Sequence, residues 1–116
     1  MVSEQETNAL AEEIRRTKTI LTALGDEVRQ HLILVMLQSP ECSGLRVLDI
    51  AAKTNLSRPA VSHHLQILKN AGIVQMRREG TKNYYYFDAA DSLSDLIHML
   101  THAKELMCQM PDRSGE

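Results

Sequence analysis

The sequence has few aromatic residues and few cysteines. Its 116 residues include no tryptophan, one phenylalanine, three tyrosines and two cysteines. Aliphatic side chains and methionine must therefore fill the core of one small domain, which favours helix over strand. Two cysteines are too few for a disulfide framework, so we expect a reducing, cytoplasmic location. No apolar run approaches the length of a membrane span, and the acidic, polar N-terminus does not resemble a signal peptide.

Motifs of catalysis are also missing from the sequence. It contains no glycine-rich phosphate loop, no nucleophile motif and no pair of carboxylates typical of a catalytic cleft. The adjacent residues His63 and His64 diverge if they lie on a helix, because neighbours are about 100° apart around its axis. We therefore do not expect an enzyme.

Positive charge is scarce overall but concentrated in one segment. The net charge is −2. Residues 53–82 carry six Lys or Arg against one Glu, a balance of +5, whereas residues 1–52 and 83–116 are both acidic. Because phosphates meet a local patch of the surface, this segment favours a nucleic-acid partner.

The basic segment contains a helix whose two ends are both encoded. Ser57 is a preferred N-cap residue, Pro59 fits the first turn, and Gly72 supplies a left-handed stop. One face between these ends is apolar at helical spacing. The donors on the other face are Arg58, Ser62, His63, Gln66 and Lys69. Such a helix suits a nucleic-acid groove.

A short helical pattern precedes this helix, and a hairpin pattern follows it. Residues 47–54 are joined to Ser57 through a tight polar turn, which is the helix-turn-helix arrangement. Residues 73–79 and 84–88 are β-prone and flank a polar tip at 80–83, which is typical of a β-hairpin. A helix-turn-helix followed by a basic hairpin predicts a winged helix.

The first part of the chain is predicted to hold two helices. Residues 4–24 repeat apolar side chains at helical spacing, and Ser3 with Glu6 fits a capping box at the start. Asp26 is expected to cap a second helix that ends near Gln38. This second helix is apolar nearly all round, which is typical of the core.

A last helix is predicted over residues 92–110, with Ser92 as its N-cap and Pro111 after its end. Its apolar stripe is wider than one small domain needs, so we expect a homodimer through this helix and helix 4–24. The predicted fold class is mainly α with a β-hairpin wing. Residues 1–110 form one winged helix-turn-helix domain in this prediction, and 111–116 a disordered tail.

The donor-rich helix and the hairpin supply the expected contacts with double-stranded DNA. Arg58 is the expected base reader, because a guanidinium pairs with the major-groove acceptors of guanine. For His64, a structural role and a DNA contact are both open. The predicted DNA-binding residues are Lys53, Ser57, Arg58, Pro59, Ala60, Ser62, His63, Lys69, Arg77, Arg78 and Lys82. A two-fold dimer places its helices about one DNA turn apart, so the operator should be an inverted repeat.

Three blocks of the sequence resemble the ArsR/SmtB transcriptional regulators. They are residues 23–29 (Ala-Leu-Gly-Asp-Glu-Val-Arg), 57–65 (Ser-Arg-Pro-Ala-Val-Ser-His-His-Leu) and 68–74 (Leu-Lys-Asn-Ala-Gly-Ile-Val). The likeness covers roughly residues 19–105. It implies a dimeric winged-helix repressor that leaves its operator when a metal or a redox signal binds.

The metal sites of that family are only partly matched. The family's thiolate site lies on the helix before the recognition helix, where Arg46 and Leu48 replace both thiols here, so we expect that site to be absent. The second family site uses the last helix, where the aligned residues are Ala89, Asp91, His102 and Glu105. Ala89 cannot bind a metal, whereas His98, one turn before His102, offers a further ligand with Asp95.

The candidate metal ligands are therefore Asp91, His98, His102 and Glu105, and the candidate metal is zinc or another divalent transition metal. The alternative is that these histidines are polar interfacial residues. Thiol sensing is also open, because some relatives join a cysteine of the second helix to one of the last helix. Cys42 and Cys108 resemble that pair, although Cys42 falls in the loop 40–44. A dimeric interaction module that does not bind DNA is the alternative for the whole chain.

Overall fold

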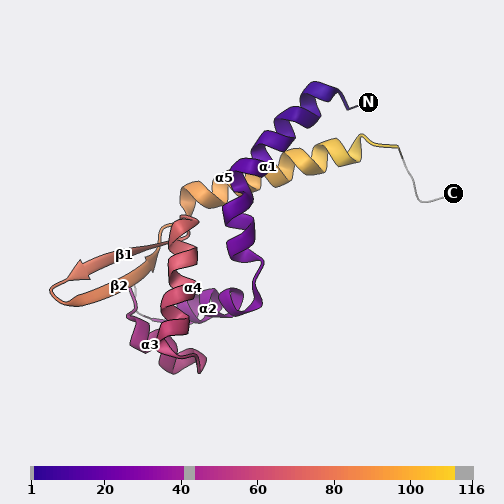
Figure 1. The fold of residues 1–116 in the computed structure, drawn as a ribbon. Coiled ribbons are helices and arrows are strands. Elements are labelled where there is room, and N and C mark those ends of the chain that lie inside the picture. The colour runs from indigo at the N-terminus through magenta and orange to yellow at the C-terminus, as the bar shows by residue number, and fades with distance from the viewer. Residues whose placement is uncertain (1, 41–43, 112–116) are drawn as a thin grey trace.

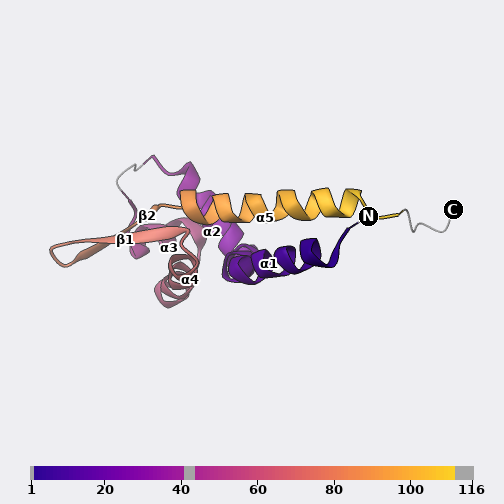
Figure 2. The same ribbon diagram turned by 90° about the horizontal axis from the view of Figure 1, so that it is seen from above.

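The computed structural model describes residues 2–40 and 44–111. Within these residues it contains five helices and one antiparallel hairpin, in the order α1 (Glu4–Leu24), α2 (Glu27–Gln38), α3 (Val47–Thr54), α4 (Arg58–Asn70), β1 (Val74–Glu79), β2 (Lys82–Phe87) and α5 (Ala90–Cys108). Helices α2, α3 and α4 form one body with the hairpin, and α1 and α5 lie against each other and extend from it (Figure 1; Figure 2). This is the predicted mainly α fold with a β-hairpin wing.

Three helices begin where the sequence predicts them, because each predicted cap forms. Ser3 Oγ accepts a hydrogen bond from the Glu6 backbone N–H at 3.1 Å. Asp26 Oδ1 accepts one from the Arg29 N–H at 3.0 Å, and Ser57 Oγ accepts one from the Ala60 N–H at 3.2 Å. Each cap satisfies a backbone donor that lacks a partner inside its helix.

The predicted start of the last helix is wrong. Helix α5 begins at Ala90, with Ala89 at its N-cap, and Ser92 lies in the first turn. The Ser92 hydroxyl is 3.0 Å from both the Ala71 and the Gly72 carbonyl oxygens, and donates to the end of α4. Ser92 therefore joins two helices instead of capping one. Gly72 itself has the predicted left-handed conformation, with φ +75°.

The core lies where α4 packs on α3, on β1 and on the end of α1, and where α2 packs on α3. Its fully buried side chains are Leu32, Ile50, Val61, Leu65, Leu68 and Val74. The segment before α3 also pairs with the wing, since Leu45 and Tyr85 exchange two backbone hydrogen bonds of 2.9 and 2.8 Å. The hairpin is thereby fixed to the helix-turn-helix at its base.

A buried arginine joins α1 to α2. The Arg29 side chain donates from Nε to the Ala23 carbonyl at 2.8 Å and from a terminal nitrogen to the Thr22 carbonyl at 3.1 Å. These carbonyls belong to the last turn of α1, where the carbonyls lack the usual partners four residues on and the helix dipole favours a cation. The Thr22 carbonyl also accepts a hydrogen bond of 3.3 Å from the Gly25 N–H. Arg29 is only 8% exposed. It therefore fixes the angle at which α1 leaves the domain.

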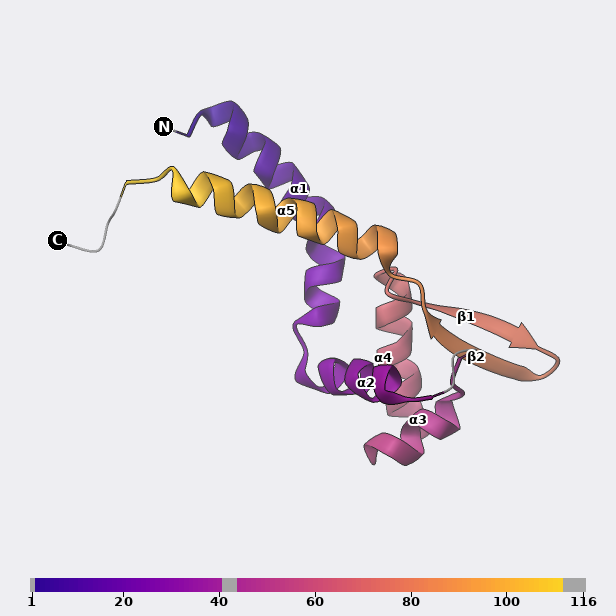
Figure 3. The same ribbon diagram turned by 180° about the vertical axis from the view of Figure 1, so that it is seen from behind.

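The molecule is elongated because α1 and α5 project from the winged helix. Its principal extents are 58 × 29 × 23 Å, and its radius of gyration is 18.2 Å, against about 13 Å for a compact domain of this length. Seen from behind, the hairpin lies at one end of the molecule and the start of α1 and end of α5 lie at the other (Figure 3). No helix in the described part of the chain is long and apolar enough to span a membrane.

Candidate nucleic-acid interface

The exposed face of α4 is built by the turn that precedes it. Helix α3 ends at Asn55, whose φ of +59° turns the chain sharply toward Ser57. Asparagine tolerates this left-handed conformation better than most residues. The turn buries the apolar stripe of α4 and leaves its donors in solvent. Of the predicted contacts, the exposed ones on or beside α4 are Ser57, Arg58, Pro59, Ser62 and His63, while Ala60 and Lys69 are half-buried.

The wing carries its basic residues on both of its faces. The Arg77 guanidinium lies 5.2 Å from the Tyr84 ring centroid, and its Nε donates to Glu79 at 3.0 Å. Arg78 donates to the Gly80 carbonyl at 3.0 Å. Strand β2 begins at Lys82, which pairs in register with Glu79. The tip is therefore Gly80 and Thr81 alone, shorter than the predicted 80–83.

A hollow of about 210 Å³ separates the wing from the starts of α3 and α4. Arg58 and Lys82 line it, together with Arg46. Sequence reasoning missed Arg46 as a candidate DNA contact, because it considered this position only as a replacement for a metal-binding thiol. The signal in the sequence is a cationic residue directly before the first helix of the helix-turn-helix.

The two adjacent histidines of α4 have different environments. His63 is exposed, whereas His64 is half-buried with Nδ1 3.4 Å from a terminal nitrogen of Arg29. Burial of the ring lowers the pKa of His64, and the positive charge of Arg29 lowers it further, while Asp26 raises it. Of the two roles open for His64, the structure favours the structural one.

Lys53 and Lys69 lie at the margins of this face. The Lys53 ammonium donates to Ser39 Oγ at 3.1 Å, which ties α3 to the end of α2. Lys69 follows Arg58 by eleven residues, about 16 Å along α4. It therefore lies near the opposite end of this helix from the exposed donors, and only a phosphate some distance along the duplex lies within its reach.

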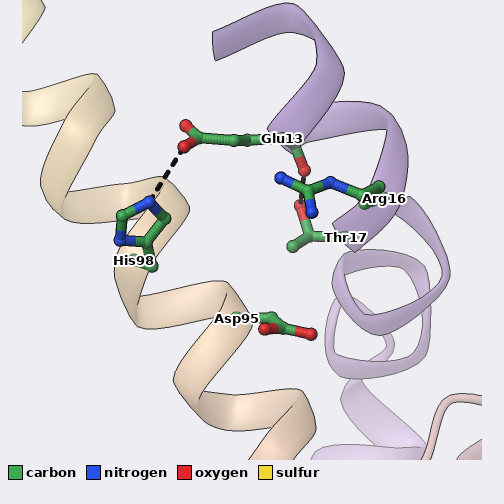
Figure 4. Close-up of a pocket in the computed structure, with 5 residues that line it drawn as sticks. All are labelled: Glu13, Arg16, Thr17, Asp95 and His98. Atoms are coloured by element: carbon green, nitrogen blue, oxygen red, sulfur yellow. Dashed lines mark hydrogen bonds and ion pairs between the residues drawn. The ribbon is translucent and has the colours of Figure 1, made fainter. Parts of the chain in front are cut away.

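The histidines of α5 contact α1 of the same chain. His98 Nε2 lies 3.0 Å from one oxygen of Glu13 (Figure 4). His102 Nδ1 lies 2.6 Å from the other oxygen. The hydrogen bond from His102 holds the pKa of the Glu13 carboxyl below its usual value, with further lowering from the charge of His98. Sequence reasoning missed Glu13 and considered Asp95 beside His98, because no local pattern indicates a contact across 85 residues.

The four candidate metal ligands do not meet within one chain. In the described ranges, no three His, Cys, Asp or Glu side chains are placed to hold a metal ion together. Asp91 precedes His102 by eleven residues, about 16 Å along α5. A set shared with a second copy stays a prediction. Cys108 is exposed at the end of α5, and Cys42 lies outside the described residues, so the thiol pair also stays a prediction.

Comparisons with known proteins identify the family. Residues 26–76 match the model of bacterial regulatory proteins of the arsR family. An uncharacterised HTH-type transcriptional regulator of Methanocaldococcus jannaschii is 33% identical over 89 residues, which are 77% of this chain and 96% of the relative. The chain belongs to the ArsR family.

Further similarity extends to a repressor and to a solved structure. The arsenical resistance operon repressor of Staphylococcus aureus is 31% identical over 86 residues, 74% of this chain and 78% of that protein. The solution structure of a homodimeric winged helix-turn-helix DNA-binding domain from Mycobacterium bovis has the same fold, with a TM-score of 0.57 at 24% identity over 97% of this chain and 98% of that chain. This ArsR-family protein is therefore a DNA-binding transcriptional regulator and not an enzyme.

Proposed function

We propose that this ArsR-family protein is a homodimeric repressor that binds an inverted-repeat operator in the cytoplasm and is released by an effector. The observation that carries the proposal is the exposed donor face of α4, which lies beside the basic wing. A donor-rich helix fits the acceptors of the major groove, and the wing reaches the adjacent backbone. A relative named as an operon repressor supports repression over activation.

Arg58 is the proposed base reader, because it is the first residue of α4 and is exposed. The residues proposed to contact the bases and the nearest phosphates beside Arg58 are Ser57, Pro59, Ala60, Ser62 and His63. The proposed phosphate contacts are Lys53, Lys69, Arg77, Arg78 and Lys82. Phosphate contacts hold the register of the helix on the duplex, whereas base contacts carry the sequence preference.

The proposed dimer interface is the uncovered apolar stripe of α5. One stripe, with Leu96 and Met99, is buried against α1. A second stripe at helical spacing is exposed, with Leu93 at 40%, Ile97 at 62%, Leu100 at 50% and Met107 at 66%. An exposed apolar surface of this kind marks an interface, and α1 also exposes the apolar side chains Ile14 and Leu21. In the proposed dimer, a second copy of the chain covers the exposed stripe of α5 and the exposed apolar side chains of α1.

The test is fluorescence anisotropy of the protein on the DNA upstream of its own gene and on scrambled DNA of equal length. Wild-type protein should prefer the upstream DNA, and Arg58→Ala should remove about 1–3 kcal/mol of that preference per half-site. The matched control is Arg15→Ala, an exposed arginine of α1. If Arg58→Ala weakens binding to both DNAs equally, Arg58 contacts a phosphate and the base-reading assignment is wrong.

The proposed effector is a divalent transition metal at α5. His98, His102 and Glu105 line a hollow of about 300 Å³ together with Glu13. Because both imidazoles already contact Glu13, a metal must compete with that carboxylate, and the partner subunit would have to bring Asp91 close. Zinc should lower operator affinity under reductant, and a chelator should restore it. Release by oxidant instead, lost in Cys108→Ser, would assign sensing to the thiols.

A further inference from the structure

Three cationic side chains from three separate elements meet at the hollow beside the wing. Arg46 is the N-cap residue of α3, Arg58 is the first residue of α4, and Lys82 is the first residue of β2. All three line the same space of about 210 Å³. Side chains of like charge repel one another, so their convergence indicates a place for an anion.

The positive charge of this hollow is not neutralised by the protein itself. Among the described residues, the side chains of Arg46, Arg58 and Lys82 make no ion pair. The two neighbouring carboxylates are already engaged. Asp49 accepts a hydrogen bond from the Arg46 backbone N–H at 3.2 Å, and Glu79 accepts one from Arg77 at 3.0 Å.

The backbone also contributes to the positive potential at the hollow. Helix α3 begins at the hollow, which Val47 and Leu48 of its first turn line, so the positive end of its dipole adds to the charge there. Three cationic side chains and the start of α3 therefore all favour an anion at this position.

We propose that this hollow is a phosphate site, filled by one phosphate of the DNA backbone in the operator complex, with Arg46 and Lys82 as its main donors. A phosphate held between α3 and β2 fixes the wing relative to α4, which sets how the wing lies on the duplex. This inference rests on the proposed DNA-binding function. It adds Arg46 as a DNA contact and gives Lys82 a specific partner.

The first test measures anisotropy on the upstream DNA as a function of salt for Arg46→Gln, with Arg15→Gln as the matched control. Arg46→Gln should weaken binding about tenfold. It should also reduce the slope of log affinity against log salt by about 0.9 for each protomer. The preference over scrambled DNA should stay unchanged, because phosphate contacts carry no sequence information. Arg46→Lys should restore the slope while recovering only part of the affinity.

The folding of these variants is checked by thermal unfolding. Arginine is not a preferred N-cap type, so glutamine at this position should leave the melting temperature near that of wild type. Wild-type affinity and salt slope in Arg46→Gln, together with losses in Arg58→Ala and Lys82→Gln, would overturn the phosphate site and leave the proposed function standing. Absence of any DNA binding by wild-type protein would instead contradict the proposed function.

The second test separates a DNA phosphate from a free anion. Inorganic phosphate is titrated into the DNA-free protein while backbone amide shifts are followed by NMR. Saturable shifts at residues 46–48 and 81–83 that vanish in Arg46→Gln, with phosphate competing against DNA, support the site. Saturation that leaves DNA affinity unchanged at constant ionic strength would assign the hollow to a free anion and overturn its place in the DNA complex.

Discussion

Replacing Arg29 by methionine should destabilise the fold through the end of α1. The variant keeps a side chain of similar length but loses two hydrogen bonds from a cation, at 2.8 and 3.1 Å, to carbonyls of the last helical turn. A hydrogen bond to a charged group contributes about 1.5–3 kcal/mol to stability. Part of the loss is offset, because the variant no longer has to bury a cation and strip it of water. We expect a net loss of about 2–4 kcal/mol in the free energy of unfolding.

The assay is urea unfolding followed by circular dichroism at one fixed chain concentration, since a dimer's stability depends on concentration. Arg29→Lys keeps the positive charge but lacks the planar guanidinium with its several donors. Its free energy of unfolding should therefore lie between those of wild type and Arg29→Met. Gln30→Ala removes a hydrogen bond of 2.7 Å from an exposed side chain to the Leu24 carbonyl and should cost less than about 1 kcal/mol. An Arg29→Met protein within about 0.5 kcal/mol of wild type would refute this account of the α1–α2 corner.

Three further predictions concern the end of α4, the half-buried ring of His64 and the dimer. Gly72→Ala should cost about 2–3 kcal/mol in chemical unfolding, because φ is +75° and the new Cβ would lie 2.4 Å from Ser92 Oγ; a loss below about 0.5 kcal/mol would contradict the strain. The His64 pKa is lowered, so unfolded chains take up the proton first and stability should fall below about pH 6.5. This fall should shrink in His64→Gln, and an unchanged profile would exclude the ring as its source. Ile97→Asp should dissociate the dimer in sedimentation while Leu37→Asp, equally exposed on α2, should not; the reverse result would place the interface elsewhere.

Local signals in the sequence were sufficient for most of the secondary structure. Ser3, Asp26 and Ser57 each cap the helix that follows them, because an N-cap depends on a backbone donor only three residues away. The same is true of Gly72, whose left-handed conformation is a property of its own backbone. These features were predicted correctly without knowledge of the tertiary structure.

Contacts between distant segments were not predictable in this way. Ser92 has the chemistry of an N-cap but donates instead to the end of α4, because tertiary packing brings those carbonyls within reach. The partner of His98 and His102 is Glu13, which only the packing of α1 on α5 reveals. The convergence of Arg46 with Lys82 likewise depends on where tertiary packing places β2 relative to the start of α3.

The most direct test of the central claim is an NMR map of the surface that DNA covers. The measurement records backbone amide shifts of the intact protein before and after addition of its upstream DNA. The account predicts that the changes concentrate at residues 46–48, 57–63 and 78–83, with the solvent face of α1 around Arg15 unchanged. Changes centred on α1 and α5 with α4 unaffected would contradict the placement of the DNA-binding surface.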